Sequence, residues 1–363
     1  MEVFDLLREA MKKARGYNQG GNPLPKLADG IIPCKLNANE NQFGPSKKVI
    51  KAMEAALKEV YLYPFEQNSI TRKAIADWLG FTPDNIAISN GSNGLICALG
   101  DIFLNPDDEV LMCSPSYLAY YSMPGRYGAK MIEIPNKNFA TDVKAMLEAI
   151  TDKTKLCILV NPNNPTGAII SNEDLQYFMD NVPSHVITII DEAYIEWVDT
   201  DGYQDATKYV RENKKVVILR TFSKVFGLAG IRFGYAITIP EIQKYILEIE
   251  NNYGPNRIAL VAAREAIKDK DYIIMSIKNN TDGRNYITKE LLALNFDVVD
   301  SYANFIYFAP KVNTKALING LNTHGVYIRD FGDVYSRVSI GLPHQNKRFI
   351  DVLKEVLLTL NND

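Results

Sequence analysis

The sequence predicts an α/β protein in which a large, doubly wound, mostly parallel sheet is joined to a smaller α+β domain. Between residues 85 and 240, short apolar segments typical of buried strands alternate with segments of helical spacing. Two of them, 186–190 (VITII) and 216–219 (VVIL), are continuous apolar runs, as expected for strands buried on both faces. After residue 240 the order changes to long helical segments followed by short strands.

Local sequence patterns predict the strands and helices between residues 85 and 240. Strands are expected at 85–89, 109–113, 130–134, 155–160, 186–190 and 216–219. A Gly-Ser turn after the first strand predicts a helix that begins near Leu95. The segment 142–150 is expected to be helical because its apolar residues fall on one face. Ser171 with Asp174 fits a capping box, which predicts a helix at 175–179.

The second part reads as an α+β unit of its own. Helices are expected at 241–250, 257–268, 272–294 (interrupted by Gly283) and 314–321, with a closing helix from Gln345. Strands are expected at 304–308 and as a pair at 326–329 and 337–340. We therefore predict a large domain over 43–245, and a small domain formed by residues 1–42 and 246–363. The chain has no Gly- or Ser-rich linker there, so the two domains are expected to pack closely.

Composition limits the classes of function. A chain of 363 residues favours two domains, and 47% hydrophobic with 23% charged residues is typical of a globular protein. Lys and Arg number 40 and Asp and Glu 43, for a net charge of −3. General nucleic-acid binding needs an excess of cations, so we do not expect it here.

Metal and membrane sites are also not expected. The cysteines and histidines have no metal-binding or redox spacing; they are Cys34, Cys97, Cys113, Cys157, His185, His324 and His344. No apolar run approaches the ~20 residues of a membrane span. The first 16 residues are charged throughout, unlike a secretory signal. We therefore expect a soluble, cytoplasmic protein.

Four polar motifs directly follow predicted strands, and in open α/β sheets ligands bind at the carboxyl ends of strands. The first motif is the turn 90–94 (NGSNG), which precedes a helix. Its glycines would let backbone N–H groups close around a phosphate at the helix N-terminus. An ordinary βα turn is the alternative interpretation.

The second and third motifs supply an amide and a carboxylate. The segment 161–167 (NPNNPTG) has two prolines and a glycine, which would stiffen a loop that presents an asparagine. Asp191, Glu192, Ala193 and Tyr194 follow the apolar strand 186–190. A carboxylate buried there would need a cation such as a protonated heterocyclic nitrogen. A rigid turn and an N-cap aspartate are the plainer alternatives.

The fourth motif is 220–235 (RTFSKVFGLAGIRFGY), with Lys224 just past a buried strand. That is an unusual place for an ammonium, and it makes Lys224 a candidate amine nucleophile. Ser223 and Arg232 flank the lysine and could both bind a phosphate. A lysine, an aspartate for a pyridine nitrogen and a phosphate site together meet the needs of pyridoxal 5′-phosphate.

In this order, the four motifs resemble those of fold-type I aminotransferases, which depend on pyridoxal phosphate. Further segments resemble the histidinol-phosphate aminotransferases: 36–41 (LNANEN), 43–46 (FGPS), 301–305 (SYANF), 325–329 (GVYIR) and 337–341 (RVSIG). The resemblance covers about residues 36 to 355. It implies a transaminase of histidine biosynthesis that takes the amino group of L-histidinol phosphate to 2-oxoglutarate.

The resemblance also implies roles for single residues. Lys224 would be the Schiff-base lysine and proton carrier, and Asp191 would pair with the pyridinium nitrogen. The remaining cofactor contacts would come from Asn164 and Tyr194 at the ring oxygen, Tyr117 on the ring face, and Ser92, Asn93, Ser223 and Arg232 at the phosphate.

Substrate and subunit contacts are implied in the same way. Arg337 would bind the substrate carboxylate or phosphate, with help from Arg329, and Asn39 is a further candidate substrate residue. Tyr63 would reach the cofactor phosphate of the other subunit, because members of the family are homodimers with shared active sites.

Two departures from the family pattern leave alternatives open. Gly94 stands where the family usually has an acidic residue, and Phe65-Glu66 follows Tyr63-Pro64 in the loop that would face the substrate. The alternatives are a paralogous aminotransferase for an aromatic or phosphorylated amine, and a pyridoxal phosphate decarboxylase such as threonine-phosphate decarboxylase.

Overall fold

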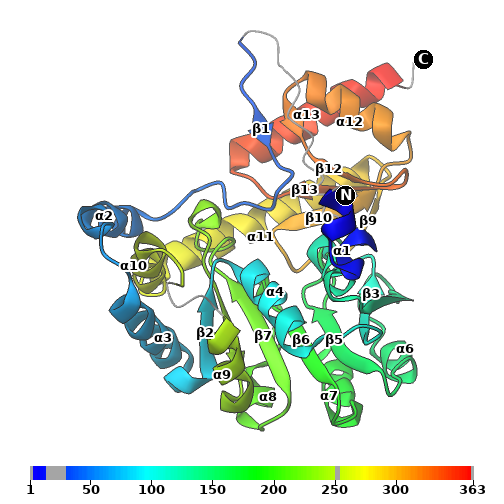
Figure 1. Ribbon diagram of the computed structural model, residues 1–363. Coiled ribbons are helices and arrows are strands. Elements are labelled where there is room, and N and C mark those ends of the chain that lie inside the picture. Colours follow the sequence, from blue (N-terminus) through cyan, green and yellow to red (C-terminus); the bar gives the residue numbers. More distant parts are fainter. Residues whose placement is uncertain (1–2, 14–29, 250–253, 361–363) are drawn as a thin grey trace.

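The structure is a computed structural model, which describes residues 3–13, 30–249 and 254–360 (Figure 1). Parts of the predicted segments 1–42 and 246–363 therefore lie outside the described residues. In Figure 1 the large sheet occupies the lower half, and the smaller unit with α12 and α13 lies above it. No helix within the described ranges has the length and apolar character needed to cross a membrane.

A seven-stranded sheet forms the centre of the larger unit, in the order β2-β8-β7-β6-β5-β3-β4. Its strands are β2 (Ile86–Ser89), β3 (Glu109–Ser114), β4 (Lys130–Pro135), β5 (Thr154–Val160), β6 (Ile187–Asp191), β7 (Val216–Thr221) and β8 (Gly234–Thr238). β8 runs in the direction opposite to the other six strands, so it is antiparallel to both of its neighbours, β2 and β7. The predicted α/β class with a mostly parallel sheet is confirmed.

Nine helices of the described residues surround this sheet. They are α2 (Lys47–Ala56), α3 (Phe65–Leu79), α4 (Ser92–Phe103), α5 (Leu118–Ser122), α6 (Val143–Glu148), α7 (Asn172–Asn181), α8 (Thr207–Arg211), α9 (Pro240–Ile249) and α10 (Arg257–Ala266). Five of them, α4, α6, α7, α9 and α10, were predicted. As the capping pattern predicted, the Ser171 hydroxyl accepts a hydrogen bond from the Asp174 N–H. The helix expected near Leu95 begins earlier, at Ser92, because Gly91 is its N-cap.

Short one-turn helices connect these elements. They are η1 (Val3–Leu6), η2 (Leu57–Glu59), η3 (Pro83–Asn85), η4 (Pro124–Tyr127), η5 (Ile195–Trp197) and η6 (Ala229–Ile231), and α1 (Glu9–Lys13) follows η1. η5 directly follows the Asp191–Tyr194 motif and η6 lies within the lysine motif. Both motifs therefore leave their strands as tight turns, which keeps their side chains close to the strand ends.

The smaller unit is built on α11 (Lys270–Ala293) and a four-stranded antiparallel sheet, in the order β12-β13-β10-β9. Its elements are β9 (Asp297–Val298), β10 (Phe305–Ala309), α12 (Thr314–Thr323), β11 (Val326–Tyr327), β12 (Arg329–Phe331), β13 (Tyr335–Ser339) and α13 (Pro343–Leu360). The segment 326–329 was predicted to pair with 337–340. Instead, β11 pairs with the N-terminal strand β1 (Cys34–Lys35). Of the predicted segment, Arg329 alone pairs with β13, as the first residue of β12, and β13 also pairs with β10.

The predicted interruption at Gly283 is wrong, because α11 runs through it without a break. A Cβ atom at this position would lie 2.6 Å from both the Asn346 amide and the Ile340 side chain. The glycine is therefore explained by the close approach of two neighbouring segments to α11, and not by a bend of the helix.

Two hydrophobic cores correspond to the two units. The larger includes Ile246 and Leu260 of α9 and α10, and the smaller includes Leu36 and Phe349. α11 contributes to both, because Ile277 packs against the larger core and Ile287 belongs to the smaller. The domain division at residue 245 stays a prediction, and α11 is the element that both cores share.

Candidate active site

The side chains that follow β2, β5, β6 and β7 meet in one cavity of about 500 Å³. Such a meeting is expected where neighbouring parallel strands end at the same edge of a sheet. Nearly all the predicted site residues line it: Asn39, Ser92, Asn93, Tyr117, Asn164, Asp191, Tyr194, Ser223, Lys224, Arg232, Arg329 and Arg337. Tyr63 does not line the cavity and is 68% exposed on the loop before α3.

Asp191 is the last residue of β6 and is almost fully buried. Burial raises the pKa of its carboxyl to about 6, although the Tyr120 hydroxyl, the Ala193 N–H and the Lys224 charge act in the opposite direction. Tyr120 donates to Oδ2 at 2.8 Å and the Ala193 N–H donates to Oδ1 at 3.1 Å. The carboxylate is thus held in one orientation at the wall of the cavity, where a bound cation would stabilise its charged form.

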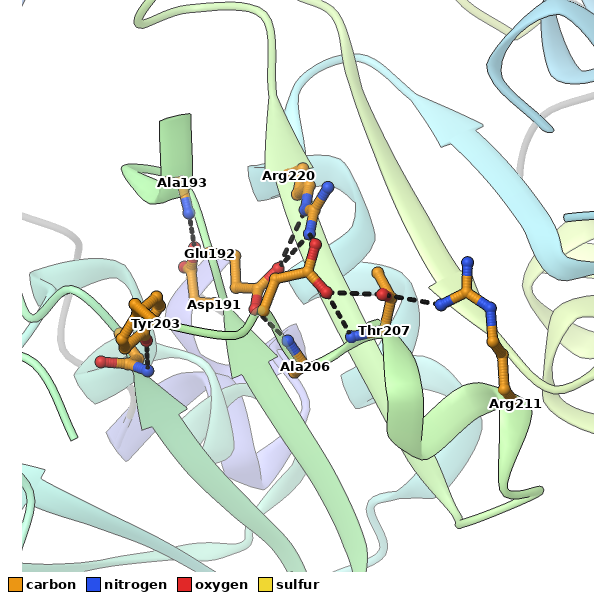
Figure 2. A network of polar contacts seen from close by, with 10 residues as sticks. Asp191, Glu192, Ala193, Tyr203, Ala206, Thr207, Arg211 and Arg220 are labelled. Carbon is orange, nitrogen blue, oxygen red and sulfur yellow. Dashed lines mark hydrogen bonds and ion pairs between the residues drawn. The ribbon is translucent and has the colours of Figure 1, made fainter. Parts of the chain in front are cut away.

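The next residue, Glu192, anchors the same turn from the other side of the strand (Figure 2). Its Oε2 accepts two hydrogen bonds from the Arg220 guanidinium, at 2.9 and 2.7 Å, and Arg220 also reaches Asp205 at 2.8 Å. Oε1 accepts from the Ala206 N–H at 2.7 Å. Because Arg220 lies on β7, this buried bidentate pair ties the end of β6 to the strand that carries the lysine motif.

Lys224 lies three residues past β7, which ends at Thr221. Its ammonium lies 5.3 Å from the centre of the Tyr194 ring, within the same cavity as Asp191. Thr221 and Ser223 are joined by a 3.0 Å hydrogen bond between their hydroxyl groups, which holds the turn before the lysine. The amine and the carboxylate that were predicted from separate motifs thus share one cavity.

The phenol of Tyr194 is surrounded by amides. Asn39 donates to its oxygen at 3.1 Å and Asn164 donates at 3.3 Å. The Tyr194 ring packs edge-on against Phe305, with 5.1 Å between the ring centres. Tyr194 is therefore fixed both by apolar packing and by two hydrogen bonds, at the point where Lys224 enters the cavity.

The N-terminus of α4 and the Arg232 side chain form an anion cradle. Gly91 precedes the helix with φ +79°, and a Cβ atom there would lie 2.7 Å from the Arg232 guanidinium. A Cβ at Gly234 would lie 2.4 Å from the Ser92 N–H. Arg232 also approaches the Ser223 hydroxyl at 3.5 Å. Free N–H groups at a helix N-terminus beside a guanidinium favour a phosphate.

Two arginines occupy the side of the cavity made by the smaller unit. Arg337 donates to Oδ1 of Asn164 and, at 2.9 Å, to the backbone oxygen of Asn37. Arg329 faces Arg337 in the β12–β13 pairing. The Phe331 ring lies 5.4 Å from each of the two guanidinium carbons. This side of the cavity is thus cationic and can bind a carboxylate or a phosphate.

Sequence patterns missed two residues of this site, Tyr120 and Phe331. Tyr120 lies three residues after Tyr117, and the two rings pack edge-on at 6.0 Å. Helical spacing within the aromatic segment 117–127 was the available signal. Phe331 follows Arg329 by two residues, so strand alternation would have placed both on one face. Among the described residues, no group of three or more His, Cys, Asp or Glu side chains is arranged to hold a metal ion.

The cavity fits pyridoxal phosphate. Asp191 is a buried carboxylate that lacks a cationic partner of its own in hydrogen-bond contact among the described residues, as a pyridinium nitrogen requires. The glycine-lined cradle at Ser92 and Arg232 fits the phosphate, and a Cβ at Gly91 would intrude on it. Lys224 offers an amine in the same cavity. The donor set therefore suits both the charged groups and the aldehyde of this cofactor.

Comparison with known proteins agrees with this chemistry. The sequence profile of the family described as "Aminotransferase class I and II" matches residues 31–353. A histidinol-phosphate aminotransferase from Moorella thermoacetica is 36% identical over 358 residues, which cover 96% of this chain and 92% of that protein. Histidinol-phosphate aminotransferase 2 from Carboxydothermus hydrogenoformans is 36% identical and covers 97% of this chain and 99% of that protein.

Solved structures show the same fold. The histidinol-phosphate aminotransferase from Sinorhizobium meliloti in complex with pyridoxal-5′-phosphate superposes with a TM-score of 0.84 at 26% identity, covering 90% of each chain. The histidinol-phosphate aminotransferase from Clostridium acetobutylicum superposes with a TM-score of 0.82 at 26% identity, covering 90% of this chain and 99% of that one.

Proposed function

The chain belongs to the class I and II aminotransferase family, and from that premise we propose that it is a pyridoxal phosphate-dependent histidinol-phosphate aminotransferase. It would transfer the amino group of L-histidinol phosphate to 2-oxoglutarate, giving imidazole-acetol phosphate and L-glutamate. The reaction belongs to histidine biosynthesis, and we propose that it takes place in the cytoplasm. The observation that carries the proposal is the cavity that Lys224, Asp191 and the two arginines share.

When bound, the cofactor supplies a carbonyl for the amine and an electron-accepting ring. Asp191 would hold a proton on the ring nitrogen. Lys224 Nζ would take the proton from the substrate Cα and deliver it to the cofactor C4′. Tyr117 and Tyr194 line the cavity that would hold the cofactor ring. Ser92, Asn93, Ser223 and Arg232 would hold the phosphate of the cofactor.

Arg337 and Arg329 set the choice of substrate. The proposed donor carries a phosphate and the proposed acceptor carries carboxylates, and the planar guanidinium of Arg337 can bind either group through two N–H donors. The bond from Arg337 to Asn164 connects this anion site with the residues around Tyr194. Asn39 lines the cavity, but its side-chain amide is engaged in hydrogen bonds with Tyr194 and Ser339.

We also propose that the active protein is a homodimer. The segment before and at the start of α3 exposes a run of large apolar side chains: Leu57, Val60, Tyr61, Leu62, Tyr63, Phe65 and Ile70. Apolar patches on a protein surface often mark an interface between subunits, and these exposed side chains come from one segment of the chain. Tyr63 would then reach the partner's cofactor phosphate. Sedimentation analysis of the purified protein tests this, since a monomer at micromolar concentration with full activity contradicts it.

A half-reaction screen tests the function. Protein loaded with pyridoxal phosphate is mixed with L-histidinol phosphate, glutamate, phenylalanine or threonine phosphate, and its visible absorbance is followed. We expect the fastest change with histidinol phosphate, and glutamate formation once 2-oxoglutarate is added. Faster turnover of phenylalanine would instead identify an aromatic aminotransferase. Carbon dioxide release without a keto acid would identify a decarboxylase. Lys224→Ala is the control and should give none of these changes.

A further inference from the structure

We infer that Ser339 and Asn39 are positioning residues, which force the phenol proton of Tyr194 to point toward the cofactor. Ser339 is the last residue of β13 and lies two residues after Arg337, so both side chains leave the same face of the strand. Ser339 and Asn39 are each only 1% exposed. The inference rests on the cofactor of the proposed function and not on its amino donor.

Ser339 determines which way the Asn39 amide is turned. The serine oxygen accepts a hydrogen bond from the Asn39 backbone N–H at 2.8 Å and donates its proton to Oδ1 of Asn39 at 2.9 Å. The Nδ2 group of Asn39 is then left to donate to Tyr194 at 3.1 Å. The reversed amide would leave the serine proton without this acceptor, so the serine hydroxyl favours the observed orientation.

Arg337 orients the second amide by the same principle. A guanidinium has donors and no acceptor, so its contact with Asn164 must be with Oδ1. Nδ2 of Asn164 therefore faces Tyr194 and donates at 3.3 Å. Two side chains from one face of β13 thus orient two amides, and both amides donate to a single phenol oxygen.

These two hydrogen bonds determine where the hydroxyl proton of Tyr194 can point. Its oxygen already accepts from Asn39 and Asn164, so the hydroxyl proton has to be donated to a third partner. Tyr194 lines the cavity together with Lys224 and Asp191. In the proposed complex, an oxygen of the cofactor ring would accept this proton. A donor to that ring oxygen stabilises its negative charge and lowers the pKa of the neighbouring nitrogen that links the cofactor to Lys224.

The backbone of Asn39 shows why asparagine occupies this position. Its φ of +55° lies in the left-handed region, which asparagine tolerates better than most residues other than glycine. Its backbone oxygen accepts a hydrogen bond from the Asn304 amide at 3.0 Å. The residue is thus held by its backbone on both sides, which leaves the orientation of its side-chain amide to Ser339.

The test is the pH dependence of the visible absorbance of the protein loaded with pyridoxal phosphate, without substrate. In Ser339→Ala the two orientations of the Asn39 amide become comparable, and the phenol proton can turn to Asn39. We expect the pH midpoint of the absorbance change to rise by roughly one unit. That shift corresponds to the free energy of one hydrogen bond to a charged group. Asn39→Asp, which offers only acceptors to Tyr194, should raise the midpoint at least as far.

Ser336→Ala is the matched control. Ser336 lies on the same strand, is fully buried, and its hydroxyl has no hydrogen-bond partner among the described residues. The absorbance midpoint of Ser336→Ala should equal that of the wild type. Thermal melting should show that all variants are folded. An unchanged midpoint in Ser339→Ala, or an equal shift in Ser336→Ala, overturns the inference. A wild-type protein that takes up no colour would instead contradict the proposed cofactor.

Discussion

The phenol of Tyr120 donates a 2.8 Å hydrogen bond to Oδ2 of Asp191, and both side chains are buried. The carboxyl has a pKa raised to about 6 by burial, so it is poised close to neutral pH in the free protein. Hydrogen bonding to the charged form favours that form. Tyr120 therefore keeps Asp191 ionised and correctly turned before the cofactor arrives.

Replacing Tyr120 by Phe should weaken cofactor binding. Without the hydroxyl the pKa of Asp191 rises further, so more of the carboxyl is protonated at pH 7 and cannot pair with a pyridinium. We expect the dissociation constant of pyridoxal phosphate to rise roughly tenfold, and the loss of affinity on acidification to begin at higher pH. Absorbance titrations at several pH values measure both. Tyr121→Phe is the control, because its hydroxyl contacts Ser114 and Ser116. Equal effects of the two substitutions would argue against a role through Asp191.

Replacing Asp191 by Asn should stabilise the protein when the cofactor is absent. The folded-state pKa of about 6 exceeds the ordinary value of 3.8, so ionisation costs folding free energy as pH rises between these values. At pH 7.5 the variant should gain about 3 kcal/mol in the free energy of unfolding, and at pH 4 very little. Urea unfolding of cofactor-free protein at both pH values measures the difference. A gain of the same size at pH 4 would mean that the carboxylate charge is not its cause.

Gly91→Ala should disrupt the phosphate cradle. The new Cβ would lie 2.7 Å from the Arg232 guanidinium and would push it away from the N-terminus of α4. We expect at least tenfold weaker cofactor binding, because an arginine–phosphate contact is strong and geometrically demanding. Gly202→Ala is a control for substitution at a positive φ, because its φ is +75° and its Cβ would meet nothing within 4 Å. It should lose roughly 1 kcal/mol of stability and keep its affinity for the cofactor. Similar affinity losses in both would assign the effect to strain alone.

The sequence predicted the strands and the polar residues that follow them, because buried parallel strands have a clear apolar pattern and their carboxyl ends meet. Lys224 and Asp191 are brought together in this way. β8 was not predicted, because its first two residues, Gly234 and Tyr235, read as the end of the lysine motif. β1 contains two residues, too few for any periodicity. β11 lies within the predicted strand 326–329, but its pairing with β1 has no signal in the local sequence.

Contacts between segments far apart in the chain could not be predicted, because no local sequence pattern indicates them. Ser339 and Asn39 are 300 residues apart in the chain, and their hydrogen bonds depend on how the N-terminal segment lies against β13. Asn39 was predicted to contact substrate, whereas its amide is engaged with Tyr194 and Ser339. The pattern identified the residue, but only the packing of the two segments shows what its amide does. Its role and those of the other site residues remain predictions for the experiments above.

Phe331 should determine how well the two arginines bind a substrate anion. The centre of its ring lies 5.4 Å from the guanidinium carbon of Arg329 and 5.4 Å from that of Arg337, so cation–π attraction helps to hold both in place. Phe331→Leu keeps an apolar side chain but removes the ring. We expect the KM for the anionic substrates to rise about fivefold to tenfold, roughly the loss of one such contact, with a smaller change in kcat.

Phe331→Tyr keeps the ring and is the matched control, with a KM close to that of the wild type. Steady-state kinetics with histidinol phosphate and with 2-oxoglutarate separate the two anions. Because Arg337 also contacts Asn164, a displaced guanidinium would change the surroundings of Tyr194 as well. The absorbance midpoint of Phe331→Leu should therefore move slightly in the same direction as that of Ser339→Ala. A variant with unchanged KM for both substrates would show that the arginines hold their positions without the ring.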